Sequence, residues 1–181
     1  LLYTTVGSME GRKGQDLLAE AIGLMPREVR EKCQFLFVGR AYEDAIVRAV
    51  RAAERSYPQA RYIENIPRAQ IGDFFRQMDC VVCPSRDDPL PVFITEGMMF
   101  SKVTICSENT GTAQIVENGV NGYVYRGNSA QEMADQMTYV ARHLEELDAL
   151  RAKSRETYEK YFTMEVFERN LTDIVENLIE V

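Results

Sequence analysis

Short apolar runs alternate with helical patterns along most of the chain. The runs of strand length are residues 1–6, 34–38, 61–66, 80–83, 103–107 and 123–125. Helical patterns, with apolar residues three or four positions apart, occupy residues 15–25, 43–55, 71–78 and 92–100 between them. This alternation predicts the α/β class, with a doubly wound parallel sheet and helices on both of its faces.

The pattern becomes helical after Gly127 and stays so to the end. Ser129 and Glu132 have the spacing of a capping box. The pair at 162–163 interrupts the helical pattern, and Thr163 is a candidate N-cap for a last helix. The apolar stripe of that helix comprises Phe167, Leu171, Ile174, Val175 and Leu178. We therefore expect a helical C-terminal tail.

Length and composition fit one domain. The chain has 181 residues, of which 45% are hydrophobic and 27% charged, enough to bury a core without a disulfide or a metal. No apolar run approaches the roughly 20 residues that span a bilayer, and no secretory signal is visible. We expect a cytoplasmic protein, in which residues 1–181 form a single domain. Because the chain starts inside an apolar run, without methionine, we also expect it to be a fragment of a longer protein.

Net charge and cysteine placement exclude two functions. The net charge of −7 is opposite in sign to the basic footprint of a nucleic-acid-binding protein. Cys80 and Cys83 form a C-x-x-C pair, but residues three apart on a strand point to opposite faces. The spacing therefore predicts buried free thiols rather than a redox pair or a zinc site.

The loops that follow the strands are the places to look for chemistry, because ligands of parallel sheets bind at the carboxyl ends of the strands. Residues 7–14 contain three glycines, followed by a helix, and place Arg12 and Lys13 near its N-terminus. Backbone N–H groups and cations at a helix N-terminus favour phosphate. A solvated turn would contain the same residues, so this loop alone does not identify a ligand.

The loop at 84–91 carries acidic groups. Seven residues separate Asp88 from Glu96, so a loop carboxylate and a helical carboxylate could meet in one pocket. Carboxylates accept hydrogen bonds from sugar hydroxyls. The alternative is that Asp87 and Asp88 only cap the helix and that Glu96 is solvated.

Taken in order, these loops resemble the C-terminal half of group-1 glycosyltransferases of the GT-B architecture. The resemblance covers nearly the whole chain. It rests on Gly7 with Lys13-Gly14, on the runs at 35–39 and 79–85, on the segment from Asp88 to Glu96, and on residues 110–122. The segment from Asp88 to Glu96 matches the family's element of two glutamates with seven residues between them.

The resemblance implies a Rossmann-like domain that binds a nucleotide-diphospho-sugar, while a missing N-terminal domain holds a glycan or lipid-linked acceptor. It implies hexosyl transfer in glycan biosynthesis with retention at the anomeric carbon, no required metal, and an inactive isolated domain. The residue roles that it implies are diphosphate for Lys13, aided by Arg12, ribose for Glu96, the transferred sugar for Asp88, the base for Ile66, and phosphate or sugar oxygens for the backbone at Thr110, Gly111 and Thr112.

The sequence also departs from the family. Ser8 stands where the family has a diphosphate-binding arginine, for which Arg12 or Arg40 could compensate. Asp88 replaces a glutamate, and Leu90-Pro91 replaces a typical Phe-Gly. Two alternatives stay open: a domain of a sugar-nucleotide epimerase or phosphorylase of similar plan, and a non-catalytic doubly wound regulatory domain. A nicotinamide-binding domain would need G-x-G-x-x-G after the first strand, which is absent.

Overall fold

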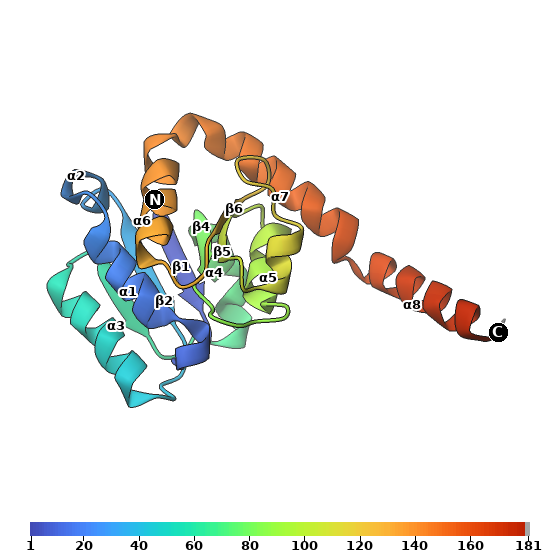
Figure 1. Ribbon diagram of the computed structural model, residues 1–181, viewed down its shortest axis with the longest axis horizontal. Coiled ribbons are helices and arrows are strands. Elements are labelled where there is room, and N and C mark those ends of the chain that lie inside the picture. The colour runs from blue at the N-terminus through green and yellow to red at the C-terminus, as the bar shows by residue number, and fades with distance from the viewer. Residues whose placement is uncertain (180–181) are drawn as a thin grey trace.

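The protein is built around a six-stranded parallel sheet of order β3-β2-β1-β4-β5-β6 (Figure 1). The computed structural model describes residues 1–179, except for the side chains of Arg68 and Ile179. The strands are β1 (Leu2–Val6), β2 (Gln34–Val38), β3 (Ala60–Ile63), β4 (Cys80–Cys83), β5 (Val103–Ser107) and β6 (Tyr123–Tyr125). This strand order is that of a doubly wound Rossmann-type fold, so the predicted fold class is confirmed.

The helices fill the connections and the C-terminal tail. They are α1 (Gln15–Leu24), α2 (Arg27–Arg30), α3 (Asp44–Ser56), α4 (Ile71–Gln77), α5 (Val92–Met99), α6 (Ala130–Arg142), α7 (Leu147–Tyr161) and α8 (Met164–Ile179), with 3₁₀ turns η1 (Gly11–Lys13), η2 (Arg68–Gln70), η3 (Gly111–Gln114) and η4 (Leu144–Glu146). Ser129 caps α6 as predicted, since its Oγ accepts the Glu132 N–H.

The third strand is shorter than predicted. β3 ends at Ile63, where it pairs with Val38, the last residue of β2. Residues 64–66 have no neighbouring strand left to pair with, so Ile66 lies in the connection to η2 rather than in the sheet. The pattern also does not predict α2, whose four residues are too few to show a period.

Two apolar clusters cover the two faces of the sheet. Buried residues of α1, α3 and α6 pack on one face, and those of α4 and α5 pack on the other, together with Tyr158 of α7. Cys80 belongs to the first cluster and Cys83 to the second, and both thiols are buried and free. The prediction that this pair points to opposite faces is confirmed.

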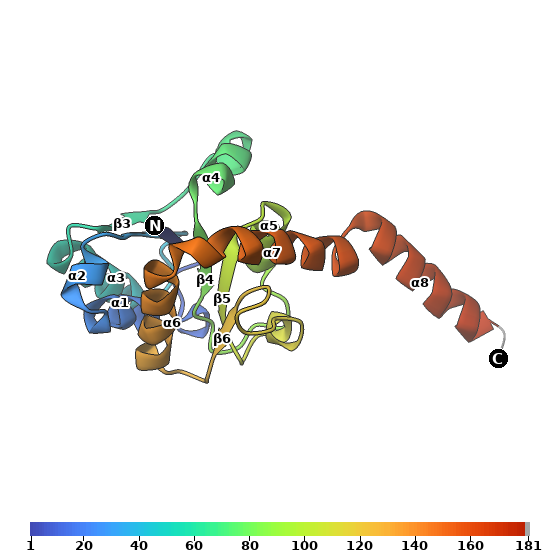
Figure 2. The same cartoon turned by 90° about the horizontal axis from the view of Figure 1, so that it is seen from above.

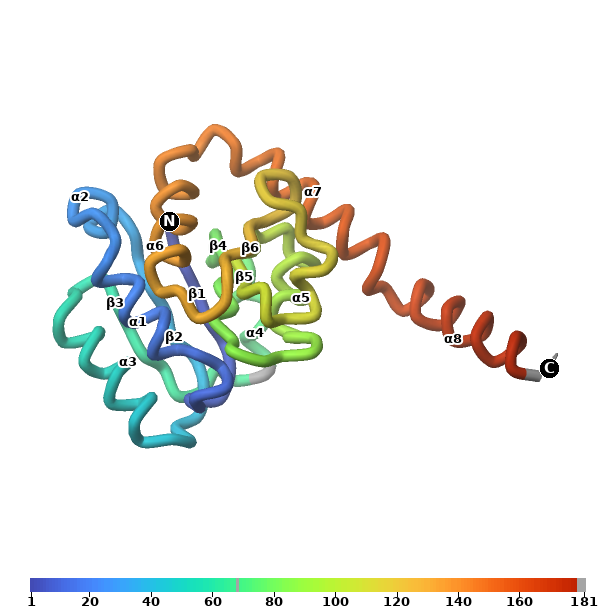
Figure 3. The backbone as a smooth tube through the Cα atoms, viewed as in Figure 1, coloured from blue at the N-terminus to red at the C-terminus, as the bar shows by residue number. Residues whose placement is uncertain are grey.

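Helix α8 projects away from the rest of the molecule (Figures 1 and 2). The Cα trace leaves the domain at the end of α7 and continues as α8 (Figure 3). The predicted stripe lies on this helix, but its side chains are exposed, from 45% at Val175 to 73% at Leu178. Of the apolar residues at the start of α8, Val166 is buried at 9% exposure.

Candidate functional site

The candidate site lies at the carboxyl edge of the sheet, between β1 and β4. The chain winds outward from β1 through β2 to β3, and from β4 through β5 to β6, which makes the β1–β4 boundary a topological switch point, where a crevice forms. A cavity of about 240 Å³ occupies this place. Its lining comprises Thr5, Val6, Lys13, Gln15, Cys83, Pro84, Ser85, Asp88, Leu90, Pro91, Val92 and Phe93.

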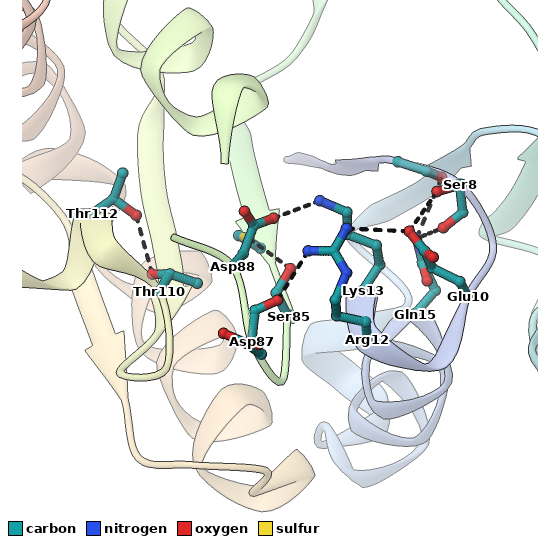
Figure 4. Close-up of polar contacts among 12 residues, drawn as sticks. Ser8, Glu10, Arg12, Lys13, Gln15, Ser85, Asp87, Asp88, Thr110 and Thr112 are labelled. Carbon is teal, nitrogen blue, oxygen red and sulfur yellow. Dashed lines mark hydrogen bonds and ion pairs between the residues drawn. The ribbon is translucent and has the colours of Figure 1, made fainter. Parts of the chain in front are cut away.

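Lys13 and Asp88 both line the cavity and form an ion pair with each other. Lys13 Nζ lies 2.5 Å from Asp88 Oδ2, and the two side chains are 22% and 7% exposed. In Figure 4 they point toward one another from the loops after β1 and β4. The structure thus brings together a cation and a carboxylate that lie 75 residues apart in the sequence.

Close backbone contacts hold three loops together at this edge. Gly14 has φ of 68°, and a Cβ there would lie 1.9 Å from the Pro84 carbonyl oxygen. A Cβ on Gly111 would lie 1.8 Å from the Pro89 carbonyl oxygen. The Gly111 N–H donates to the Asp88 carbonyl at 3.0 Å. Loops 7–14, 84–91 and 108–112 thus meet at the carboxyl edge of the sheet, where ligands of parallel sheets bind.

Helix α5 begins at the cavity without a side-chain cap. Its N-cap is Pro91, and no side chain bonds to its first N–H groups, so the alternative in which Asp87 and Asp88 cap this helix is wrong. The positive end of the helix dipole therefore faces the cavity through Val92 and Phe93.

Glu96 lies one turn further along α5 and does not line the cavity. It is half-buried, and this burial raises the pKa of its carboxyl group. No hydrogen bond or ion pair engages its carboxylate within residues 1–179. Its predicted contact with a ribose stays a prediction.

The loop at 108–112 is tied internally. The Thr110 hydroxyl donates to the Ser107 carbonyl at 2.8 Å and lies 3.1 Å from the Thr112 hydroxyl, a contact drawn in Figure 4. The Thr110 N–H donates to Ser107 as well. The loop thus supports Asp88 through Gly111, and a direct contact of Thr110, Gly111 or Thr112 with a ligand stays a prediction.

Arg12 stands at the rim between the loops (Figure 4). Its guanidinium donates to the Asp87 carbonyl at 3.1 Å and lies 3.4 Å from a Glu10 carboxylate oxygen. Ser8, at the family's arginine position, donates its hydroxyl to the same Glu10 oxygen at 2.7 Å. Arg12 is 46% exposed, so it is free to turn toward an anion in the crevice.

Ile66 and Arg40 lie outside the cavity lining. Ile66 is half-buried between β3 and η2, and Arg40 is exposed just after β2. Both follow strands on the β2–β3 side of the switch point, so any contact with a ligand would come from a group that extends beyond the cavity. Their roles stay predictions.

Two polar side chains that shape the site could not be recognised from the sequence. Gln15 is 1% exposed and donates its amide to the Gly7 and Ser8 carbonyls. Arg86 forms a two-pronged ion pair with Asp16 at 2.8 and 2.7 Å. Both residues occupy loop or helix-start positions where polar side chains usually face water, so only the fold shows what they contact.

Residues 1–157 match the family model of glycosyl transferases group 1. The chain belongs to this family, which confirms the resemblance. It is 24% identical over 129 residues to a glycogen synthase of Thermodesulfovibrio yellowstonii, covering 71% of this chain and 25% of that protein. It is 23% identical over 176 residues to an uncharacterized glycosyltransferase of Methanocaldococcus jannaschii, covering 96% and 47% respectively.

Solved structures share the fold. Anabaena HepE in complex with UDP and glucose superposes with a TM-score of 0.82 at 19% identity, covering 99% of this chain and 48% of that one. Sucrose-phosphate synthase of Thermosynechococcus elongatus gives 0.83 at 19%, covering 99% and 45%. The pneumococcal O-GlcNAc transferase GtfA in complex with UDP and GlcNAc gives 0.79 at 20%, covering 98% and 36%. The chain thus spans about half or less of these relatives.

In the part of the chain that the structure describes, no helix has the length and apolar character that crossing a membrane requires. The cytoplasmic location stays a prediction.

Proposed function

We propose that this chain is the donor-binding domain of a glycosyltransferase and holds a nucleotide-diphospho-sugar in the crevice between β1 and β4. The observation that carries the proposal is the Lys13–Asp88 ion pair in the lining of a cavity at the switch point. Two proteins of the same fold support it, because HepE was solved with UDP and glucose and GtfA with UDP and GlcNAc.

The proposed roles follow from the chemistry of glycosyl transfer. The bond between the anomeric carbon and the diphosphate breaks, and negative charge builds on the leaving group. The Lys13 ammonium, the Arg12 guanidinium and the free N-terminus of α5 would stabilise that charge. Asp88 would accept a hydrogen bond from the transferred sugar and Glu96 from the ribose. The proposal assigns this stabilisation to protein groups without a metal and carries over retention from the family.

The donor must compete with an existing contact. Lys13 is already paired with Asp88, so a diphosphate gains Lys13 only by loosening that pair, while the sugar hydroxyls offer Asp88 a replacement donor. The exchange is more favourable when both ends of the ligand take part. We therefore expect a nucleotide sugar to bind more tightly than the matching free nucleoside diphosphate.

A panel of nucleotide sugars tests the proposal. UDP-, GDP-, ADP- and CMP-sugars are added to the purified chain at millimolar concentration, and the unfolding temperature is measured. A ligand bound only by the folded state must raise that temperature. We expect at least one of them to do so, and a panel without any shift would overturn the proposal.

The acceptor site is proposed to lie on a second domain. The matched regions occupy 48% of HepE and 45% of the sucrose-phosphate synthase, so each of those proteins holds a further half. The match with HepE extends over 99% of this chain, and its projecting α8 offers an apolar stripe for that half to cover. We therefore expect the 181-residue chain to bind a donor without transferring its sugar efficiently to any added acceptor.

Charged substitutions in the apolar stripe of α8 should show whether the stripe contacts a second domain or contributes to the folding of this one. Phe167→Glu and Ile174→Glu should change the unfolding temperature of this chain by less than about 1 °C, because both side chains are 58% exposed. Val166→Glu, at a position 9% exposed, is the control and should lower it. In the two-domain protein the first two variants should lower stability. A large loss in the isolated chain would show that the stripe already packs within this domain.

Acidification should weaken donor binding through Glu96. Burial raises the pKa of Glu96. The ionised carboxylate accepts hydrogen bonds from ribose hydroxyls more strongly than the protonated acid does, so affinity should fall as the pH drops through the raised pKa. A nucleotide sugar is the suitable ligand, since its doubly esterified diphosphate does not titrate near pH 6. Calorimetry should show this slope for the native chain. Glu96→Gln should lose roughly 1–3 kcal/mol of binding free energy at neutral pH, and its affinity should not change with pH in this range. An equal pH dependence of affinity in both proteins would exclude Glu96 from the site.

A further inference from the structure

Arg86 ties the loop after β4 to both ends of the turn that contains Lys13. Its Nη1 donates to the Gly11 carbonyl at 2.6 Å and to Asp16 Oδ1 at 2.8 Å, and its Nη2 donates to Asp16 Oδ2 at 2.7 Å. Its backbone N–H donates to the Arg12 carbonyl at 2.8 Å. One residue thus contacts three positions of the segment 11–16, from 70 to 75 residues away in the sequence.

These contacts leave Lys13 between two fixed points. Gly11 precedes it in η1, and Asp16 follows it in the first turn of α1. Lys13 Nζ reaches Asp88 from the same turn. Arg86 itself does not line the cavity, so it can act on a ligand there only through the segment that it holds.

The Arg86–Asp16 ion pair also determines the ionisation state of Asp16. Burial disfavours the ionised form of Asp16, but the hydrogen bonds and the charge of Arg86 outweigh it and hold the pKa of Asp16 below its usual range. Asp16 is therefore a carboxylate at neutral pH, and it directly follows Gln15, which lines the cavity. The Arg86 guanidinium neutralises it, and a bidentate fork does so with fixed geometry.

We propose that Arg86 is a positioning residue for donor binding, which fixes segment 11–16 so that the Lys13 ammonium faces the crevice. The proposal rests on the function proposed above. It predicts that Arg86 matters through Lys13 rather than through its own charge.

A double-mutant cycle tests this coupling, with UDP, GDP and ADP as probes in an NMR titration that measures millimolar constants. Arg86→Lys keeps the charge but loses the fork, and it should weaken binding about tenfold in the native background. In the Lys13→Met background, Arg86→Lys should lower the nucleotide affinity by less than about twofold. Arg76→Lys, which alters an exposed pair with Asp73, is the control and should change nothing. Equal losses in both backgrounds, or no loss in either, would overturn the proposal.

Asp16→Asn separates positioning from electrostatics. The change removes a negative charge beside the cavity, so a purely electrostatic effect would tighten nucleotide binding. Positioning predicts the opposite, because Arg86 loses its two-pronged partner and segment 11–16 loosens. Weaker binding in this variant supports the proposal, and tighter binding contradicts it.

Hydrogen exchange tests positioning without any ligand. The Lys13 and Gly14 N–H groups donate to the Glu10 and Gly11 carbonyls and close the held turn. In Arg86→Lys they should exchange at least about tenfold faster, with the strand amides unchanged. If the native chain binds none of the probes, the proposed function fails, and this arm still decides the role of Arg86. Unchanged exchange at both amides would overturn it.

Discussion

Replacing Lys13 with methionine should weaken binding of the nucleoside diphosphate by about a hundredfold, equivalent to about 2.7 kcal/mol. Methionine keeps most of the apolar stem of lysine but removes the ammonium. The diphosphate loses a charge-assisted hydrogen bond, worth about 1.5–3 kcal/mol. Asp88, whose side chain is 7% exposed, also loses its partner and is left as an uncompensated carboxylate beside the anion. The two effects act in the same direction.

Two further variants test whether the loss of affinity in Lys13→Met comes from the lost ammonium group. Lys153→Met removes a lysine that pairs with Glu156 on the exposed face of α7, and it should leave affinity unchanged. Lys13→Met with Asp88→Asn removes both charges, so it should recover part of the loss and part of any decrease in thermal stability. Calorimetry measures the affinities. A loss below about threefold in Lys13→Met would mean that the diphosphate does not contact this residue.

Gly14→Ala should be strongly destabilising for the addition of a single methyl group. Two costs add: φ of 68° is unfavourable for alanine, by about 1–2 kcal/mol, and the new Cβ would lie 1.9 Å from the Pro84 carbonyl oxygen. A backbone oxygen cannot rotate away as a side chain can. We expect a loss of at least about 3 kcal/mol in the free energy of unfolding, or a fall in Tm on the order of 10 °C.

Gly119→Ala is the matched control for that change. Gly119 has φ of 75°, but nothing lies within 4 Å of the point that a Cβ would occupy there, so it has the conformational cost without the collision. Gly119→Ala should lower the free energy of unfolding by only about 1–2 kcal/mol. Thermal unfolding of the two variants side by side gives the comparison. Equal losses would show that the loops after β1 and β4 are not in contact at Gly14.

The fold was largely predictable because each strand is a short apolar run between helical patterns. In β4, all four residues of Cys80–Cys83 are buried, and such a strand stands out in any hydropathy pattern. The end of β3 was not predictable, because Ile66 is apolar like Ile63 and only the end of β2 at Val38 stops the pairing. The hydropathy pattern indicates which residues are buried, whereas the length of a strand depends on how far its neighbouring strand extends.

The meeting of the loops was predictable for a different reason. Parallel strands place their carboxyl ends at one edge, so the loops with Lys13 and Asp88 were expected at the same edge once the class was known. Their direct pairing and the contact of Arg86 with Asp16 were not, since these side chains come from loops 70 residues or more apart. A charged loop residue appears solvated in the sequence until its partner is known. The missing cap of α5 was equally hidden, because Asp87 and Asp88 precede the helix and have the right chemistry to cap it.

Chemical-shift mapping tests the central claim most directly. The ¹⁵N-labelled chain is titrated with the nucleotide sugar that gives the largest thermal shift, and with UDP-glucose if none does. The account predicts shifts concentrated at residues 7–16, 84–96 and 108–112, the three loops at the carboxyl edge and the helix starts beside them, and their loss in Lys13→Met. Shifts confined to the opposite edge of the sheet, or no shifts at millimolar ligand, would contradict it.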